Sequence, residues 1–173
     1  MSILKWLGFA TEDKGRPEAE SVRRLVDALE QLEPERARFL GAFAFILARV
    51  AHADLHISDE EVAEMERILV AEGQLPVEQA ALVVQIAKAN RIFGATDDFL
   101  ATREFKARST RAERLQALRC LFAVSAADDR ITTVEEEVVR QIASELGLDH
   151  AEYVAIRAEY RDKREILKGG GPG

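Results

Sequence analysis

Apolar residues recur every three or four positions along most of this chain, the spacing that places them on one face of an α-helix. No stretch alternates strictly between apolar and polar residues, as a half-buried β-strand would. The pattern therefore predicts an all-α protein. We expect about eight helices, over residues 18–32, 35–53, 58–72, 77–90, 97–106, 110–127, 133–146 and 150–164.

Prolines and capping residues mark the ends of these helices. Pro34 and Pro76 suit first turns, where the N–H that proline lacks would have no partner in the helix. Gly73 can end the helix before Pro76, because glycine tolerates the backbone that closes a helix. Three further helices have hydroxyl or carboxylate residues suited to N-caps, which are Thr96, Ser109 or Thr110, and Asp149.

The length of 173 residues favours one folded domain. We expect an apolar segment and linker over residues 1–16, a helical domain over 17–167, and a disordered Gly/Pro tail over 168–173. The apolar segment lacks the cleavage site of a signal peptide, and no stretch approaches the roughly 18 apolar residues of a membrane span. We expect its apolar side chains to fold back onto the domain, to make weak contact with a membrane surface or to dock onto a partner; they are Ile3, Leu4, Trp6, Leu7 and Phe9.

Two segments, residues 50–61 and 124–135, align without a gap. Each carries an aspartate, an isoleucine three positions later, a hydroxyl residue next, and a glutamate seven positions after the aspartate. We therefore expect two helix–loop–helix hairpins of one design, packed about a pseudo-twofold axis so that each buries the other's apolar face. The acidic residues of the two segments are Asp54 and Glu61, and Asp128 and Glu135.

These acidic residues have two explanations. Ser58 with Glu61, and Thr132 with Glu135, have the spacing of capping boxes, which account for the hydroxyl and the glutamate. Each aspartate either ends the preceding helix by accepting local hydrogen bonds or joins its glutamate in binding a cation. The spacing matches part of an EF-hand loop, but the oxygen ligands that open such a loop are missing, so an orthodox EF-hand is excluded.

Two histidines flank the aspartate of the first segment only. His52 and His56 either face solvent at the end of a helix or supply nitrogen ligands. Nitrogen ligands would shift the preference of the site towards zinc or another transition metal.

The charge balance narrows the class of partner. A formal net charge of −7, with no basic run, disfavours binding to nucleic acid and is compatible with binding cations. The single cysteine, Cys120, lies in an apolar helical run, so we expect a buried, inert thiol and a reducing compartment. No nucleophile pattern or glycine-rich phosphate loop is present, so we expect no enzymatic activity; a metal-dependent hydrolase is the catalytic alternative.

Over residues 36–160 the chain resembles the TerB family of tellurite-resistance proteins, whose repeated helical unit contains Ala-Asp-Gly, a hydrophobic residue and then Glu. The family's glycine is replaced here by Leu55 and Asp129. The matching residues are Ala53-Asp54, Ile57 and Glu61 in the first segment, and Ala127-Asp128, Ile131 and Glu135 in the second.

The resemblance implies a TerB-like helical bundle in the cytoplasm, peripheral to the inner face of the membrane. It also implies a role in stress responses of the tellurite or metal type, or as a scaffold that binds a protein partner. The metal-facing set that it implies is Asp54, Glu61, Asp128 and Glu135. With these oxygen ligands we expect a divalent cation such as Ca²⁺, Mg²⁺ or Mn²⁺ rather than Zn²⁺. The alternative is a purely structural interaction domain without metal.

Overall fold

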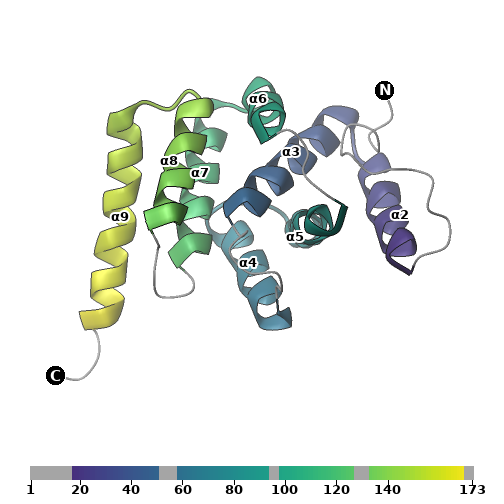
Figure 1. Cartoon of the computed structure of the whole chain (residues 1–173), viewed down its shortest axis with the longest axis horizontal. Helices are drawn as coiled ribbons and strands as arrows, with labels where there is room; N and C mark the ends of the chain where they lie inside the picture. The colour runs from purple at the N-terminus through teal and green to yellow at the C-terminus, as the bar shows by residue number, and fades with distance from the viewer. Residues whose placement is uncertain (1–16, 51–57, 94–97, 127–132, 170–173) are drawn as a thin grey trace.

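The computed structural model describes residues 17–50, 58–93, 98–126 and 133–169 (Figure 1). In these ranges every element is a helix, and there are eight, which confirms the predicted all-α class. The helices are α2 (Pro17–Glu30), α3 (Pro34–Val50), α4 (Asp59–Ala71), α5 (Val77–Phe93), α6 (Asp98–Arg108), α7 (Arg111–Ala126), α8 (Thr133–Glu145) and α9 (His150–Gly169).

The predicted and observed helix ends differ most in α9. This helix continues to Gly169, beyond the predicted end at residue 164 and two residues into the predicted tail. The stretch that follows Tyr160 contains lysine, arginine, glutamate and leucine, which are good helix formers, and no proline or glycine precedes Gly169. Residues 170–173 lie outside the described part of the chain.

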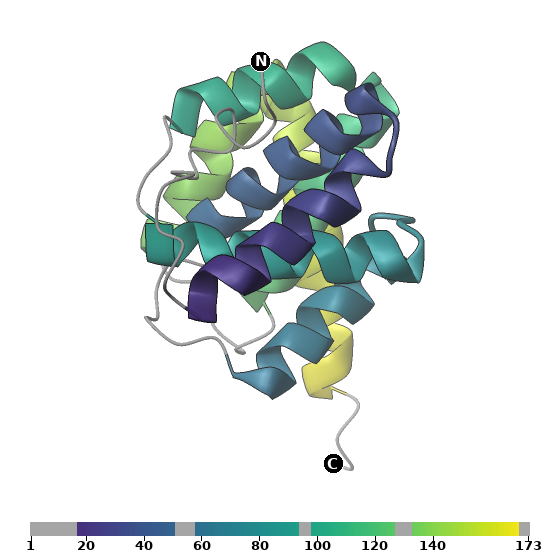
Figure 2. The ribbon, with the colours of Figure 1, turned by 90° about the vertical axis from the view of Figure 1, so that its right-hand side faces the viewer.

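Helix α3 forms the centre of the molecule. Residues 39–48 of α3 are all buried, as expected for a helix that is apolar on every side. It packs against α5 and α6 most extensively and also contacts α2, α7 and α8. Helix α2 covers α3 and α5 on one side of the bundle (Figure 2).

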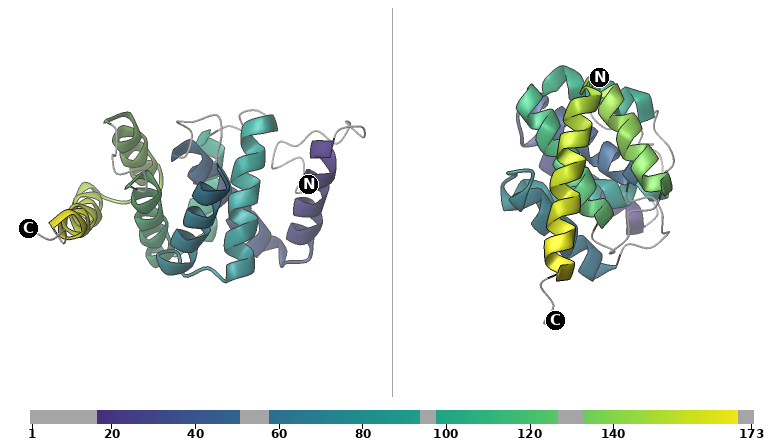
Figure 3. Two further views of the ribbon diagram at one scale, coloured as in Figure 1. Left: turned by 90° about the horizontal axis from the view of Figure 1, so that it is seen from below. Right: turned by 90° about the vertical axis from the view of Figure 1, so that its left-hand side faces the viewer.

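Helix α7 organises the other half. It contacts α8 and α9 as well as α3 and α4, and its buried face includes Leu118, Cys120 and Phe122. Helix α9 lies at one end of the molecule, against α7 and α8, while α2 lies at the opposite end (Figure 3). None of the described helices is long and apolar enough to cross a bilayer.

Helices α4 and α8 match in length and in their spacing along the chain. Helices α4 and α8 each contain 13 residues and begin 74 positions apart, at Asp59 and Thr133. Helix α3 contacts α8, and α7 contacts α4, which is the reciprocal pattern that a twofold relation produces. These features fit the expected pair of hairpins. The connections 51–57 and 127–132, which include Ile57 and Ile131, lie outside the described residues, so the equivalence of the two isoleucines stays a prediction.

The turns after α4 and α8 differ by one residue. Helix α8 ends in a Schellman motif, in which Gly147 has a φ of 77° and the N–H of Leu148 donates to the carbonyl of Ala143 at 3.0 Å. After α4 the residue with positive φ is Gln74 (55°), one position beyond Gly73. Gly73 is still required, because a Cβ there would lie 2.6 Å from the Leu69 carbonyl oxygen.

Candidate functional site

The capping box of the first segment is formed. Ser58 has an extended backbone (φ −71°, ψ 162°), and its hydroxyl accepts a hydrogen bond from the N–H of Glu61 at 3.2 Å. In return, the N–H of Ser58 donates to Oε2 of Glu61 at 2.7 Å. Asp59 and Glu60 share this first turn, where the helix dipole favours negative charge. Capping therefore accounts for Glu61 and Ser58, as the sequence analysis allowed.

Glu135 occupies the corresponding place in the second half. It is the third residue of α8, as Glu61 is the third residue of α4, and both side chains are half-buried. Its expected capping partner, Thr132, lies outside the described residues. Helices α4 and α8 both run upwards in the view of Figure 1, so their first turns lie towards the same, lower side of the molecule.

The structure does not test the complete predicted metal site. Asp54 and Asp128 lie in the connections outside the described residues, as do His52 and His56. Among the residues that are described, no three histidine, cysteine, aspartate or glutamate side chains gather closely enough to hold a metal ion. The four carboxylates therefore stay a predicted set, of which the structure places Glu61 and Glu135.

Cys120 is buried, as predicted. Its side chain has no exposed surface, and it packs beside the turn at Gly73. Burial, with a smaller contribution from the negative charge of Glu72, raises the pKa of the Cys120 thiol to about 12. Because the thiolate is the reactive form, a thiol that stays protonated at neutral pH is a poor nucleophile and a poor metal ligand.

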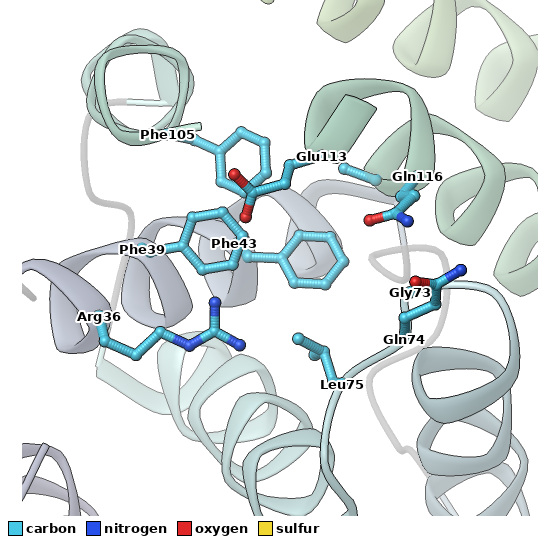
Figure 4. Close-up of a pocket in the computed structure, with 10 residues that line it drawn as sticks. Arg36, Phe39, Phe43, Gly73, Gln74, Leu75, Phe105, Glu113 and Gln116 are labelled. Atoms are coloured by element: carbon cyan, nitrogen blue, oxygen red, sulfur yellow. The ribbon is translucent and has the colours of Figure 1, made fainter. Parts of the chain in front are cut away.

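A pocket that no sequence pattern predicts lies between α3, α6, α7 and the α4–α5 turn (Figure 4). Three phenylalanines form its wall: the rings of Phe39 and Phe105 are stacked with centroids 4.9 Å apart, and Phe43 lies 5.7 Å from Phe105. Phe39 and Phe43 follow the helical apolar period of their own segment, but no spacing in the sequence relates them to Phe105. The pocket's polar side chains are Arg36, Gln74, Glu113 and Gln116.

Comparison with known proteins identifies a family. A search of curated proteins and a search of solved structures both return no significant match. A family model described as tellurite resistance protein TerB matches residues 40–158, which is more than half of the chain and includes both acidic segments. Because this match covers most of the chain and the described residues form an all-helical bundle, this chain belongs to the TerB family.

Proposed function

We propose that this protein is a non-enzymatic TerB-family module that binds a divalent cation and acts in the response to tellurite- or metal-type stress, or as a protein-interaction scaffold in that response. The observation that supports the proposal is the matched placement of Glu61 and Glu135. Each is the third residue of its helix, and the two helices begin on the same side of the molecule (Figure 1). Asp54 and Asp128 complete the proposed ligand set.

The chemistry of these ligands favours a hard cation bound weakly. Carboxylate oxygens suit Ca²⁺, Mg²⁺ or Mn²⁺. The capping box uses Oε2 of Glu61, which leaves Oε1 of the same carboxylate for a cation. A helix N-terminus carries partial positive charge, so the cation needs the aspartates to offset that repulsion. Because the site has few protein ligands and the helix dipole opposes a cation, we expect the cation to bind with modest affinity and to keep several of its water ligands.

The decisive experiment is calorimetric titration of the full chain with Ca²⁺, Mg²⁺, Mn²⁺ and Zn²⁺. Glu61→Gln is the sharpest variant, because glutamine at this position keeps the capping box and removes only the charge. We expect Glu61→Gln and the double variant Asp54→Asn, Asp128→Asn each to weaken cation binding at least about tenfold, while the folded state survives. Glu60→Gln, an exposed acidic residue of the same turn, is the matched control and leaves affinity unchanged.

A purely structural module without metal is the second candidate, and the geometry of Glu61 favours it. Both partners of the capping box are satisfied, so the glutamate has a structural role in the absence of any cation. This candidate predicts no heat of binding with any of the four metals, and no difference between Glu61→Gln and Glu60→Gln. That outcome would refute the metal proposal and leave the fold and family assignment unchanged.

The proposed location is the cytoplasm, at the inner face of the membrane. The support is the apolar character of the first nine residues of the sequence, which include Trp6 and Phe9. Co-sedimentation of the full chain with anionic lipid vesicles tests the proposal. We expect the double variant Trp6→Ala, Phe9→Ala to lose most of any binding, whereas equal sedimentation of both proteins would contradict it.

A further inference from the structure

The pocket beside the three phenylalanines has a wall that is already packed. Phe105 is 1% exposed and touches both Phe39 and Phe43, so these rings support one another without a ligand. Leu75 and Ala117 extend the apolar surface. The free volume of about 150 Å³ is comparable to an engineered cavity that admits one benzene molecule. A space of this size accepts one small side chain and excludes a nucleotide or a folded peptide.

Arg36 is held in place on one side of this pocket. Its Nε and Nη2 donate to Oε1 of Gln79 at 3.0 and 2.6 Å, and its guanidinium lies 4.9 Å from the centre of the Phe39 ring. These contacts fix the planar guanidinium before any ligand arrives. The remaining nitrogen of the Arg36 guanidinium, Nη1, does not bond to Gln79 and can donate to an anionic group in the pocket. An arginine that is fixed in place and has N–H groups without a partner is suited to binding a carboxylate.

Glu113 supplies the opposite charge. Its Oε1 accepts a hydrogen bond from the N–H of Thr110 at 3.0 Å in the capping box of α7, which leaves Oε2 for another donor. Figure 4 shows the Glu113 carboxylate and the Arg36 guanidinium on different sides of the rings of Phe39 and Phe43. Within the described chain the two charges form no ion pair with each other. They therefore present separate positive and negative groups to one small space.

Two side-chain amides also line the pocket. Gln74 and Gln116 each offer a donor and an acceptor to a polar ligand. Gln74 is the only residue other than glycine with a positive φ in the described ranges. This backbone conformation determines the direction in which its side chain leaves the turn. Strained backbone of this kind persists where the surrounding structure requires it, and it is common at binding sites.

We propose that this pocket binds a free α-amino acid with an apolar side chain. The carboxylate of the ligand pairs with Arg36, its ammonium group pairs with Glu113, and its side chain lies against Phe39 and Phe43. One positive and one negative wall group match a zwitterion, whereas a simple carboxylate or a simple amine would leave one of the two charges without a partner. The proposal concerns a site separate from the acidic connections and does not depend on metal binding.

The test uses L-leucine and two blocked forms, N-acetyl-leucine and leucinamide, titrated into the isotopically labelled full chain. The side-chain amide signals of Gln74 and Gln116 report binding directly. We expect leucine to shift both signals with a dissociation constant of the order of 1 mM or tighter, and each blocked form to bind at least about tenfold more weakly. Glu113→Gln keeps the capping box of α7, so the fold is retained.

The variants should separate the two charges. Glu113→Gln weakens leucine binding about tenfold but leaves N-acetyl-leucine, which has no ammonium group, unchanged. Arg36→Gln weakens leucine binding and leaves leucinamide, which has no carboxylate, unchanged. Arg67→Gln, an exposed arginine of α4 outside the pocket, is the control. Absence of leucine binding up to about 10 mM would overturn the proposal. So would equal affinity for all three ligands, which would mean that neither the carboxylate nor the ammonium group of leucine is recognised.

Discussion

Helix α5 follows α4 and helix α9 follows α8, but the two helices pack differently. Helix α5 packs more extensively against α3 than α9 packs against α7. Three buried positions of α5 have buried counterparts in α9 at a constant offset of 73 residues: Ala80, Val83 and Ala87 in α5, and Tyr153, Ile156 and Tyr160 in α9. Small side chains allow α5 to lie close to its neighbour, whereas the tyrosines, which pack on Phe122, hold α9 further away.

The offset between the halves changes at a single turn. It is 74 residues at the start of α4 and α8, and 73 residues at the buried positions of α5 and α9. The extra residue lies in the turn where Gln74, rather than glycine, has positive φ. One residue inserted in a helix would rotate its apolar face by about 100°. Placed in the turn, it leaves the buried face of α5 aligned with that of α9.

The largest expected effect comes from exchanging side-chain size at the paired positions. Tyr160→Ala should destabilise the protein by about 3–5 kcal/mol, because it removes a buried ring that packs on Phe122. Ala87→Leu should cost about 1–3 kcal/mol by overfilling the tight contact of α5. Denaturant unfolding measures both changes. Val154→Ala, at an exposed position of α9, is the control and should change stability by less than about 0.5 kcal/mol.

A near-neutral Ala87→Leu variant would contradict the comparison, because it would mean that α5 has unused space beside it. A small effect of Tyr160→Ala would instead mean that α9 contributes little to the bundle.

The two turns give the next prediction. Gly147→Gln should destabilise by about 1–2 kcal/mol, because an L-residue other than glycine is disfavoured at a φ of 77°. Gln74→Gly should have the opposite sign and stabilise by up to about 1 kcal/mol. Thermal and denaturant unfolding of both variants test this difference in sign. A destabilising Gln74→Gly would show that contacts of the glutamine side chain outweigh its backbone strain.

Much of the fold could be predicted from the sequence because its signals are local. The helical period places five apolar residues on adjoining faces of α3, and all five are buried: Phe39, Phe43, Ile46, Leu47 and Val50. Capping residues could be predicted equally well. Thr110 and Glu113 form reciprocal hydrogen bonds, and so do Asp149 and Glu152. Each of these features depends on residues within one or two turns of one another.

The features that could not be predicted depend on contacts between distant segments. Phe105 meets Phe39 and Phe43 only because α6 packs on α3, and the positive φ of Gln74 follows from how two helices are joined. For the acidic segments, spacing predicted both the capping box and a shared cation site. The structure describes the capping box at Ser58 and Glu61, while both aspartates lie outside the described residues.

The capping residues test whether the two hairpins start their second helices in the same way. We expect Ser58→Ala to destabilise by roughly 0.5–2 kcal/mol, since it removes the acceptor for the N–H of Glu61. Thr132→Ala should cost the same if the second segment forms the predicted capping box. Unequal losses in denaturant unfolding would indicate that the hairpins differ at this point.

The smallest expected effect is a dependence of stability on alkaline pH that arises from Cys120, in the second half. The position that corresponds to Cys120, 74 residues earlier, is Ile46, which does not titrate. Burial raises the pKa of the Cys120 thiol from 9.0 to about 12. Between these values the unfolded chain has lost the thiol proton and the folded chain has kept it. Stability is therefore fully retained below about pH 8 and falls as the pH rises above about 9.

By pH 9.5 the loss from this thiol should be no more than about 1 kcal/mol, before the tyrosines ionise substantially in the unfolded chain. Burial also raises the pKa of Tyr153 and Tyr160, so their contribution has the same sign but begins at higher pH. Cys120→Ala should lower stability at every pH and abolish most of the slope between pH 8 and 9.5. Denaturant unfolding across this range measures the slope. An unchanged slope in the variant would mean that another group, and not this buried thiol, makes the second half sensitive to alkali.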